Sequence, residues 1–169
     1  MLLEKKNQIL DETVIRRKIK RITYEIFEKN FQEKELVLAG VVGTGFNFAR
    51  LIYDELKKIS PFEIKLVKIT LDKNAPLSGE VSLDVDINQM RNKTIVIIDD
   101  VLYTGHTFMQ SLKPFLDIEI NRIQTAVLIN RSHKMFPIAA DFVGYELSTT
   151  VKETIKVMLN DENLAVFLY

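Results

Sequence analysis

Two stretches of the sequence are apolar at consecutive positions, and each leads through a turn into a helical pattern. They read LVLAGVV at 36–42 and TIVII at 94–98, which is apolar from Ile95 onward. Because every position is apolar, and not every second one, both faces of such a strand must be buried. That is typical of parallel strands covered by helices on two sides. The chain is therefore predicted to adopt an α/β fold.

The rest of the pattern agrees with a mostly parallel central sheet flanked by helices. Helices are predicted at about 11–30, from the turn 43–45 to about residue 58, and at about 107–117, with further strands at 63–71, 122–130, 141–147, 154–159 and 163–169. Pro114 should kink or shorten the third helix, because its ring blocks a helical hydrogen bond. Without repeats or Pro/Gly-rich linkers, residues 1–169 are expected to form one domain, with about 72–86 as a hood, hairpin or flexible loop.

Composition excludes several classes of protein. Lys+Arg and Asp+Glu both number 23, so a formal net charge of +0 removes a global electrostatic argument for nucleic-acid binding, although a local basic face remains compatible. The absence of cysteine excludes disulfides and thiolate metal sites. No segment reaches the roughly 18–20 apolar residues that span a bilayer, and the first ten residues lack the apolar core of a signal peptide. A cytoplasmic protein without a membrane partner is predicted.

The first strand-to-helix turn, GVVGTGFNFA at 40–49, superficially resembles a dinucleotide-binding fingerprint. It does not fit that motif, because Phe48 stands where the third small residue is required. Gly43 and Gly45 do allow the backbone to approach a ligand closely. The turn therefore indicates either a simple connection or a nest of backbone amides that binds an anion at the start of the next helix.

The second turn lies in VIIDDVLYTGHT at 96–107 and is more specific. Asp99 and Asp100 offer carboxylates that accept hydrogen bonds from vicinal hydroxyls or hold Mg²⁺ directly or through water. Backbone amides and two hydroxyls suited to a phosphate follow at Thr104, Gly105, His106 and Thr107. The whole turn therefore fits a ribose 5-phosphate. The alternative is an acidic strand end followed by an ordinary helix cap.

These residues are similar to a known motif. VIIDDVLYTGHT resembles the phosphoribosyl-pyrophosphate (PRPP) binding motif of type I phosphoribosyltransferases. Residues 9–30, 98–107, 123–150 and the ending resemble the bifunctional pyrimidine-operon attenuator/uracil phosphoribosyltransferase family, and the similarity covers nearly the whole chain, weakest at about 60–93. The resemblance implies the type I phosphoribosyltransferase fold with a small hood, and a homodimer or higher homo-oligomer. It also implies Mg²⁺-dependent transfer from PRPP to uracil, giving UMP and pyrophosphate.

The resemblance also implies roles for individual residues. By this resemblance, Asp99 and Asp100 would bind the ribose hydroxyls and a water-linked Mg²⁺, and residues 104–107 would bind the 5-phosphate. The catalytic residues would be Asp99, Asp100 and Tyr103. Pyrophosphate binding falls to Gly43, Thr44, Gly45 and Lys73, and base binding to Phe142, Val143 and Gly144. RNA contacts would come from Arg17, Lys20, Arg21, His133 and Lys134.

The chain differs from the family at several places, three of them among the predicted phosphate-binding segments and the hood. Residues 42–45 read VGTG where the family has Lys-Thr-Arg-Gly, residues 72–75 read DKNA where it has Tyr-Arg-Asp-Asp, and His106 replaces an arginine. A missing arginine removes a bidentate partner of diphosphate. Two alternatives therefore stay open, namely a PRPP- or UMP-sensing regulator that contacts RNA with little catalysis, and a transferase for another base. Tyr103 favours a pyrimidine, since purine enzymes place a carboxylate there.

Overall fold

The computed structural model describes residues 7–71, 79–131, 133–150 and 152–169. The helices are α1 (Glu12–Asn30), α2 (Thr44–Ile59) and α3 (His106–Leu112), with short 3₁₀ helices η1 (Ile87–Met90) and η2 (Lys113–Phe115). The strands are β1 (Asn7–Leu10), β2 (Glu35–Val41), β3 (Glu63–Thr70), β4 (Ser82–Leu83), β5 (Thr94–Leu102), β6 (Arg122–Arg131), β7 (Phe142–Leu147), β8 (Ile155–Asn160) and β9 (Asn163–Leu168).

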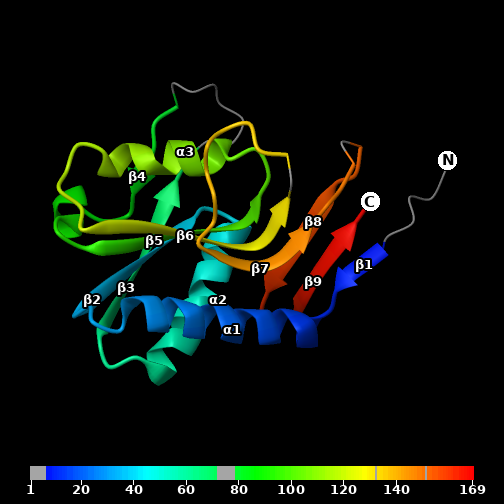
Figure 1. Cartoon of the computed structure of the whole chain (residues 1–169), viewed down its shortest axis with the longest axis horizontal. Coiled ribbons are helices and arrows are strands. Elements are labelled where there is room, and N and C mark those ends of the chain that lie inside the picture. Colours follow the sequence, from blue (N-terminus) through cyan, green and yellow to red (C-terminus); the bar gives the residue numbers. More distant parts are fainter. Residues whose placement is uncertain (1–6, 72–78, 132, 151) are drawn as a thin grey trace.

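The described strands form two sheets (Figure 1). The larger has six strands in the order β4-β3-β2-β5-β6-β7, of which the last five are parallel and β4 runs antiparallel to β3. The smaller is an antiparallel sheet of three strands, β1-β9-β8, at one end of the larger one (Figure 1). The predicted α/β class with a mostly parallel central sheet is confirmed.

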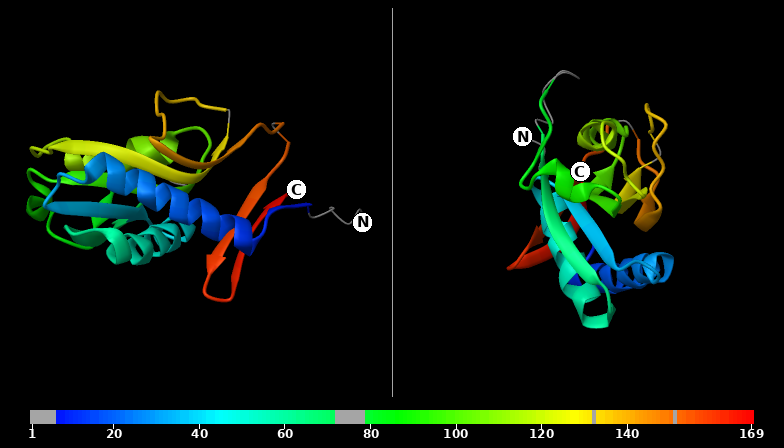
Figure 2. Two further views of the ribbon diagram at one scale, coloured as in Figure 1. Left: turned by 60° about the horizontal axis from the view of Figure 1, so that its bottom comes forward. Right: turned by 90° about the vertical axis from the view of Figure 1, so that its left-hand side faces the viewer.

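Helices cover both faces of the larger sheet, which explains the consecutive apolar residues. In Figure 2, α1 and α2 lie on one side of the sheet and α3 on the other. Along β5, Val96 and Ile98 pack in the core under α1 and α2, whereas Ile95 and Ile97 pack in the core under α3. Alternate side chains of one strand therefore enter different cores, and both sets must be apolar. No helix in the described part of the chain is long and apolar enough to cross a membrane.

Helix α1 begins at a side-chain cap. The carboxylate of Asp11 accepts a hydrogen bond from the amide of Val14 at 2.8 Å, and the isoleucines spaced along the next four turns are buried. Since this bond satisfies an amide that has no partner within the helix, Asp11→Ala should lower the free energy of unfolding by about 1 kcal/mol. Urea denaturation measures this change. The matched control is Asp161→Ala, which removes a 91% exposed carboxylate and should stay within about 0.5 kcal/mol of the parent.

Several boundaries differ from the sequence-based predictions. The strand predicted at 94–98 continues to Leu102, so both aspartates lie on β5 and not in a turn after it. The third helix ends at Leu112 and continues as η2, which confirms the shortening expected from Pro114. The strand β1 was not predicted. Of the predicted hood, residues 72–78 with Lys73 lie outside the described residues, and Ser82–Leu83 forms the short antiparallel strand β4.

Candidate active site

The two turns singled out in the sequence meet at one edge of the larger sheet. β2 is hydrogen-bonded to β3 on one side and to β5 on the other. The strands that follow β2 are therefore first added on the β3 side of the sheet, and from β5 onward on the other side. In open α/β sheets, ligands bind at the carboxyl ends of the strands where the order reverses in this way. The turn after β2 and the turn after β5 both lie at that position.

Gly45, in the first turn of α2, lies directly against Asp99 of β5. A Cβ atom added to Gly45 would stand 2.4 Å from Asp99 Oδ1 and 3.0 Å from Asp99 Cα, which only a glycine avoids. Asp99 is 2% exposed, and its Oδ1 accepts the amide of Asp100 at 2.9 Å. The carboxylate therefore lies at the amino end of α2, where the helix dipole favours negative charge. The contact sets the spacing of the two turns.

The turn after β5 folds tightly before α3. Gly105 has φ = 88°, in the left-handed region that favours glycine. The hydroxyl of Thr104 accepts the amide of His106 at 3.2 Å, and the side chains of Thr104, His106 and Thr107 are all half-buried. The predicted phosphate-binding residues are thus consecutive in one turn that is partly open to solvent. Their binding role stays a prediction.

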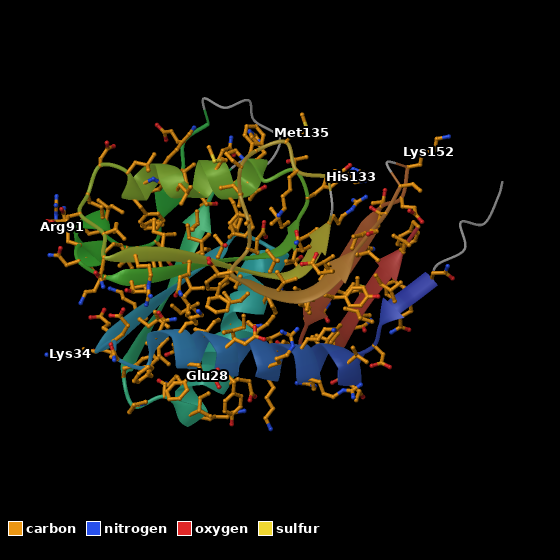
Figure 3. All side chains as sticks on the ribbon, viewed as in Figure 1. Glu28, Lys34, Arg91, His133, Met135 and Lys152 are labelled. Atoms are coloured by element: carbon orange, nitrogen blue, oxygen red, sulfur yellow. The ribbon has the colours of Figure 1, made fainter. Side chains whose placement is uncertain are left out.

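The segment 133–140 packs against this turn. The carbonyl of Thr104 accepts the amides of Met135 at 2.9 Å and Phe136 at 3.0 Å, and the rings of Phe136 and His106 lie 5.4 Å apart. A Cβ on Gly105 would stand 3.3 Å from Phe136 Cβ, which shows how closely the segment approaches. Figure 3 shows Met135 and His133 on the side of the sheet opposite Glu28 of α1. The segment therefore supports the turn from the α3 side.

The predicted catalytic residue Tyr103 contacts the end of β6. Its ring centre lies 4.1 Å from Cζ of Arg131 and 5.7 Å from the ring of His133, which it meets edge to face. The residues predicted to bind the base lie further away along β7. Phe142 is 2% exposed and packs under α1, and the space beside Gly144 is filled by the carbonyl of Leu128. Base binding by residues 142–144 stays a prediction.

The residues predicted to contact RNA fall into two groups. Arg17, Lys20 and Arg21 are exposed on α1, whereas His133 and Lys134 belong to the segment beside α3. Arg21 is engaged within the molecule, since its Nη2 donates to the carbonyls of Val143 and Gly144 at 2.9 and 2.8 Å. The structure thus joins Arg21 to the predicted base-binding strand.

Lys18 adds a further cation to this part of α1. Its Nζ donates to the carbonyl of Gly144 at 3.0 Å and lies 4.9 Å from the centre of the Tyr145 ring. Burial lowers the pKa of Lys18, and the nearby positive charges of Arg21 and Arg17 lower it further. Arg17, Lys18 and Arg21 therefore place three positive charges close together on α1.

Arg131 and Thr149 were missed by the sequence-based reasoning. Arg131 is 6% exposed, and its Nε and Nη2 donate to Thr149 Oγ1 at 2.9 and 2.6 Å. The one available signal was an arginine at the end of an otherwise apolar strand that follows the acidic strand in the sequence. Because Arg131 is not part of the apolar pattern, the periodicity of the sequence does not predict that it is buried.

The fold and the paired turns define a class of enzyme. A family model described as the phosphoribosyl transferase domain matches residues 5–162, and the chain belongs to this family. Solved structures agree, since the chain superposes with a TM-score of 0.79 on hypoxanthine phosphoribosyltransferase from Trypanosoma cruzi, at 19% identity over 98% of this chain and 91% of that one. The superposition on a hypoxanthine-guanine phosphoribosyltransferase from Bacillus anthracis has a TM-score of 0.72, at 18% identity over 86% of this chain and 84% of that one.

The similarity to relatives in sequence points to one particular kind of phosphoribosyltransferase. The chain is 35% identical to the "Bifunctional protein PyrR" of Bacillus pumilus over 99% of both chains. It is 36% identical to the protein of the same name from Clostridium novyi, over 94% of this chain and 93% of that one. The resemblance to the bifunctional attenuator family is thereby confirmed, and the chain is a phosphoribosyltransferase. The solved structures, below 25% identity, support the fold alone.

Proposed function

We propose that the protein transfers the ribose 5-phosphate of PRPP to a pyrimidine base, with uracil as the acceptor and UMP and pyrophosphate as products. The observation that supports this proposal is the contact between Gly45 and Asp99, because it brings the carboxylate pair next to the two turns that are predicted to bind the phosphates. Ribose hydroxyls would donate to Asp99 and Asp100, and the 5-phosphate would accept hydrogen bonds from residues 104–107. Diphosphate would lie at the glycine turn, residues 43–45.

The donor set is compatible with Mg²⁺ that arrives with its substrate. Within the described residues, no group of three or more His, Cys, Asp and Glu side chains is arranged to hold a metal. Mg²⁺ usually takes one or two carboxylates and completes its shell with water and substrate phosphates. Asp99 and Asp100, with the diphosphate of PRPP, supply that combination. When bound, the ion would neutralise negative charge on the departing diphosphate.

The residues of the chain would then act mainly by placing charge. Displacement at the anomeric carbon develops positive charge on the ribose ring, and carboxylates held nearby stabilise it electrostatically. Asp99 is already fixed by burial and by its bond to the amide of Asp100, so little reorganisation is needed. The absence of the family's arginine from residues 42–45 leaves backbone amides and the Thr44 hydroxyl as the protein's donors to diphosphate in this turn.

The assay mixes protein, PRPP, MgCl₂ and one base, and detects nucleotide by chromatography. With uracil, UMP and pyrophosphate should form in equal amounts and only with Mg²⁺ present. A panel of cytosine, orotate, hypoxanthine and guanine tests the choice of base. Efficient turnover of a purine and none of uracil would contradict the pyrimidine assignment, and no turnover with any base would contradict the transferase proposal.

A regulatory role is the second candidate, and the clustered cations Arg17, Lys18 and Arg21 on α1 favour it. A regulator of this kind would bind UMP or PRPP with little turnover, and its basic helix would contact RNA phosphates. In the same assay mixtures, ligand at about 100 times its dissociation constant should stabilise the fold by about 2.7 kcal/mol. Stabilisation without nucleotide formation would select this role over the transferase.

A further inference from the structure

Arg131 stands at the carboxyl end of β6, beside the residue that precedes the phosphate turn. The register pairs Leu102 of β5 with Asn130 of β6, so Tyr103 and Arg131 follow as neighbours on adjacent strands. The guanidinium lies over the Tyr103 ring, 4.1 Å from its centre, and the residue is only 6% exposed. A planar cation in this position restricts the ring to one orientation.

The same guanidinium binds the connection between β7 and β8. Its Nε and Nη2 donate to Thr149 Oγ1, and Nη2 also donates to the carbonyl of Glu153 at 3.0 Å. A ring nitrogen of His133 lies 2.8 Å from the carbonyl of Thr149. Among the described residues, no carboxylate lies within ion-pair distance of Arg131, and the Glu153 carboxylate interacts with its charge only at longer range. A buried guanidinium that is bonded mainly to neutral oxygens is costly to retain for stability alone.

The order of the strands indicates which part of the reaction this cluster faces. The glycine turn follows β2, on one side of β5, and Arg131 ends β6, on the other side. In a displacement at a sugar carbon, the entering group attacks from the face opposite the leaving group. With diphosphate at the β2 side, the acceptor base enters from the β6 side. Tyr103, Arg131 and Thr149 lie there.

We propose that Arg131 is a positioning residue for the acceptor base. It holds the Tyr103 ring and Thr149 at a fixed separation, so that the surface presented to the base is preorganised before binding. The inference rests on the proposed function. It concerns how Arg131 arranges Tyr103 and Thr149, and not a direct contact between Arg131 and the base.

Arg131→Met keeps the length and much of the volume of the side chain but removes its charge and donors. The KM for uracil should rise about tenfold, because Tyr103 and Thr149 would then have to be ordered when the base binds, while the KM for PRPP changes by less than about threefold. Arg131→Lys should restore only part of the affinity, since an ammonium cannot make the bidentate and stacked contacts. Equal increases in both KM values, or none, would overturn the proposal.

Arg122→Met is the matched control, because Arg122 begins the strand that Arg131 ends. Its guanidinium also donates to neutral oxygens, the carbonyl of Lys29 at 3.3 Å and Asn30 Oδ1 at 2.9 Å, at the opposite edge of the sheet, and it forms an additional ion pair with Glu33 at 3.4 Å. Both KM values should be unchanged in this variant. Should Arg131→Met fail to fold, Thr149→Val removes only the acceptor hydroxyl and should raise the KM for uracil about threefold.

A double-mutant cycle tests whether Arg131 acts through the ring. Tyr103→Leu removes the stacked partner, and the increases in KM for uracil caused by Tyr103→Leu and Arg131→Met should be less than multiplicative in the double variant. Fully multiplicative effects would exclude action through Tyr103. If the parent protein transfers no base at all, the proposed function fails, whereas an active parent with an unaltered Arg131→Met variant refutes the positioning role alone.

Discussion

Replacing both aspartates, Asp99→Asn/Asp100→Asn, should lower kcat/KM for PRPP by about 100- to 10,000-fold. Two hydrogen bonds to charged acceptors contribute about 1.5–3 kcal/mol each, and each 1.4 kcal/mol corresponds to a factor of ten. The substitutions keep the shape of the side chains, and an asparagine oxygen can still accept the bond that Asp99 Oδ1 takes from the amide of Asp100. The fold should therefore persist. Steady-state kinetics of UMP formation measure the effect.

The control for this variant is Asp86→Asn. Asp86 also accepts a backbone amide, that of Asn88 at 2.8 Å, but does so at the exposed start of η1. Its kcat/KM should equal that of the parent. If the double variant turns over PRPP at the normal rate, the carboxylates have no part in the reaction, and the assignment of the site to the turn after β5 is wrong.

Gly45→Ala should abolish detectable transfer and destabilise the fold by about 1–3 kcal/mol, the usual effect of forcing atoms into a filled space. The new Cβ would stand 2.4 Å from Asp99 Oδ1 and 3.0 Å from Asp99 Cα, so β5 or the first turn of α2 must move. Either movement separates the carboxylate from the glycine turn. The measurements are the melting temperature and the kcat at a temperature where the variant is fully folded.

Gly40→Ala provides the comparison for Gly45→Ala. Its Cβ would stand 2.7 Å from Ala49 Cβ and 2.9 Å from Phe46 Cα, which is a comparably severe clash between β2 and α2 but one that does not involve Asp99. Stability should fall by a similar amount. The folded fraction should retain most of its activity. If both variants lose activity in proportion to stability, the Gly45–Asp99 contact has no special role.

Much of the fold was predictable because local and tertiary requirements agree in this sequence. Helix α1 has a cap at Asp11 and buried isoleucines at helical spacing, and its observed end at Asn30 matches the prediction. The end of β5 was not predictable in this way, because Asp99 and Asp100 interrupt the apolar pattern. Pairing with β6 continues beyond them as far as Leu102. The tertiary partner, and not the local composition, decides where that strand ends.

The site was predictable in its components and not in its arrangement. Sequence indicates that both turns lie at the carboxyl edge of a parallel sheet, but only the strand order shows that β2 and β5 are neighbours and that Gly45 meets Asp99. Arg131 illustrates the reverse problem. An arginine at a strand end is ordinarily a surface residue. Arg131 is buried because it packs against Tyr103 and Thr149, which are distant from it in the sequence and belong to no periodic apolar pattern.

The cations that α1 directs at β7 have a consequence for the solubility of the sheet. β7 is the outermost described strand on its side, and such an edge ordinarily offers free carbonyls that another chain can pair with. Here the carbonyl of Val143 accepts from Arg21, and that of Gly144 accepts from both Arg21 and Lys18. The helix therefore occupies backbone acceptors of this strand with two positive charges, which an approaching β-strand would have to displace.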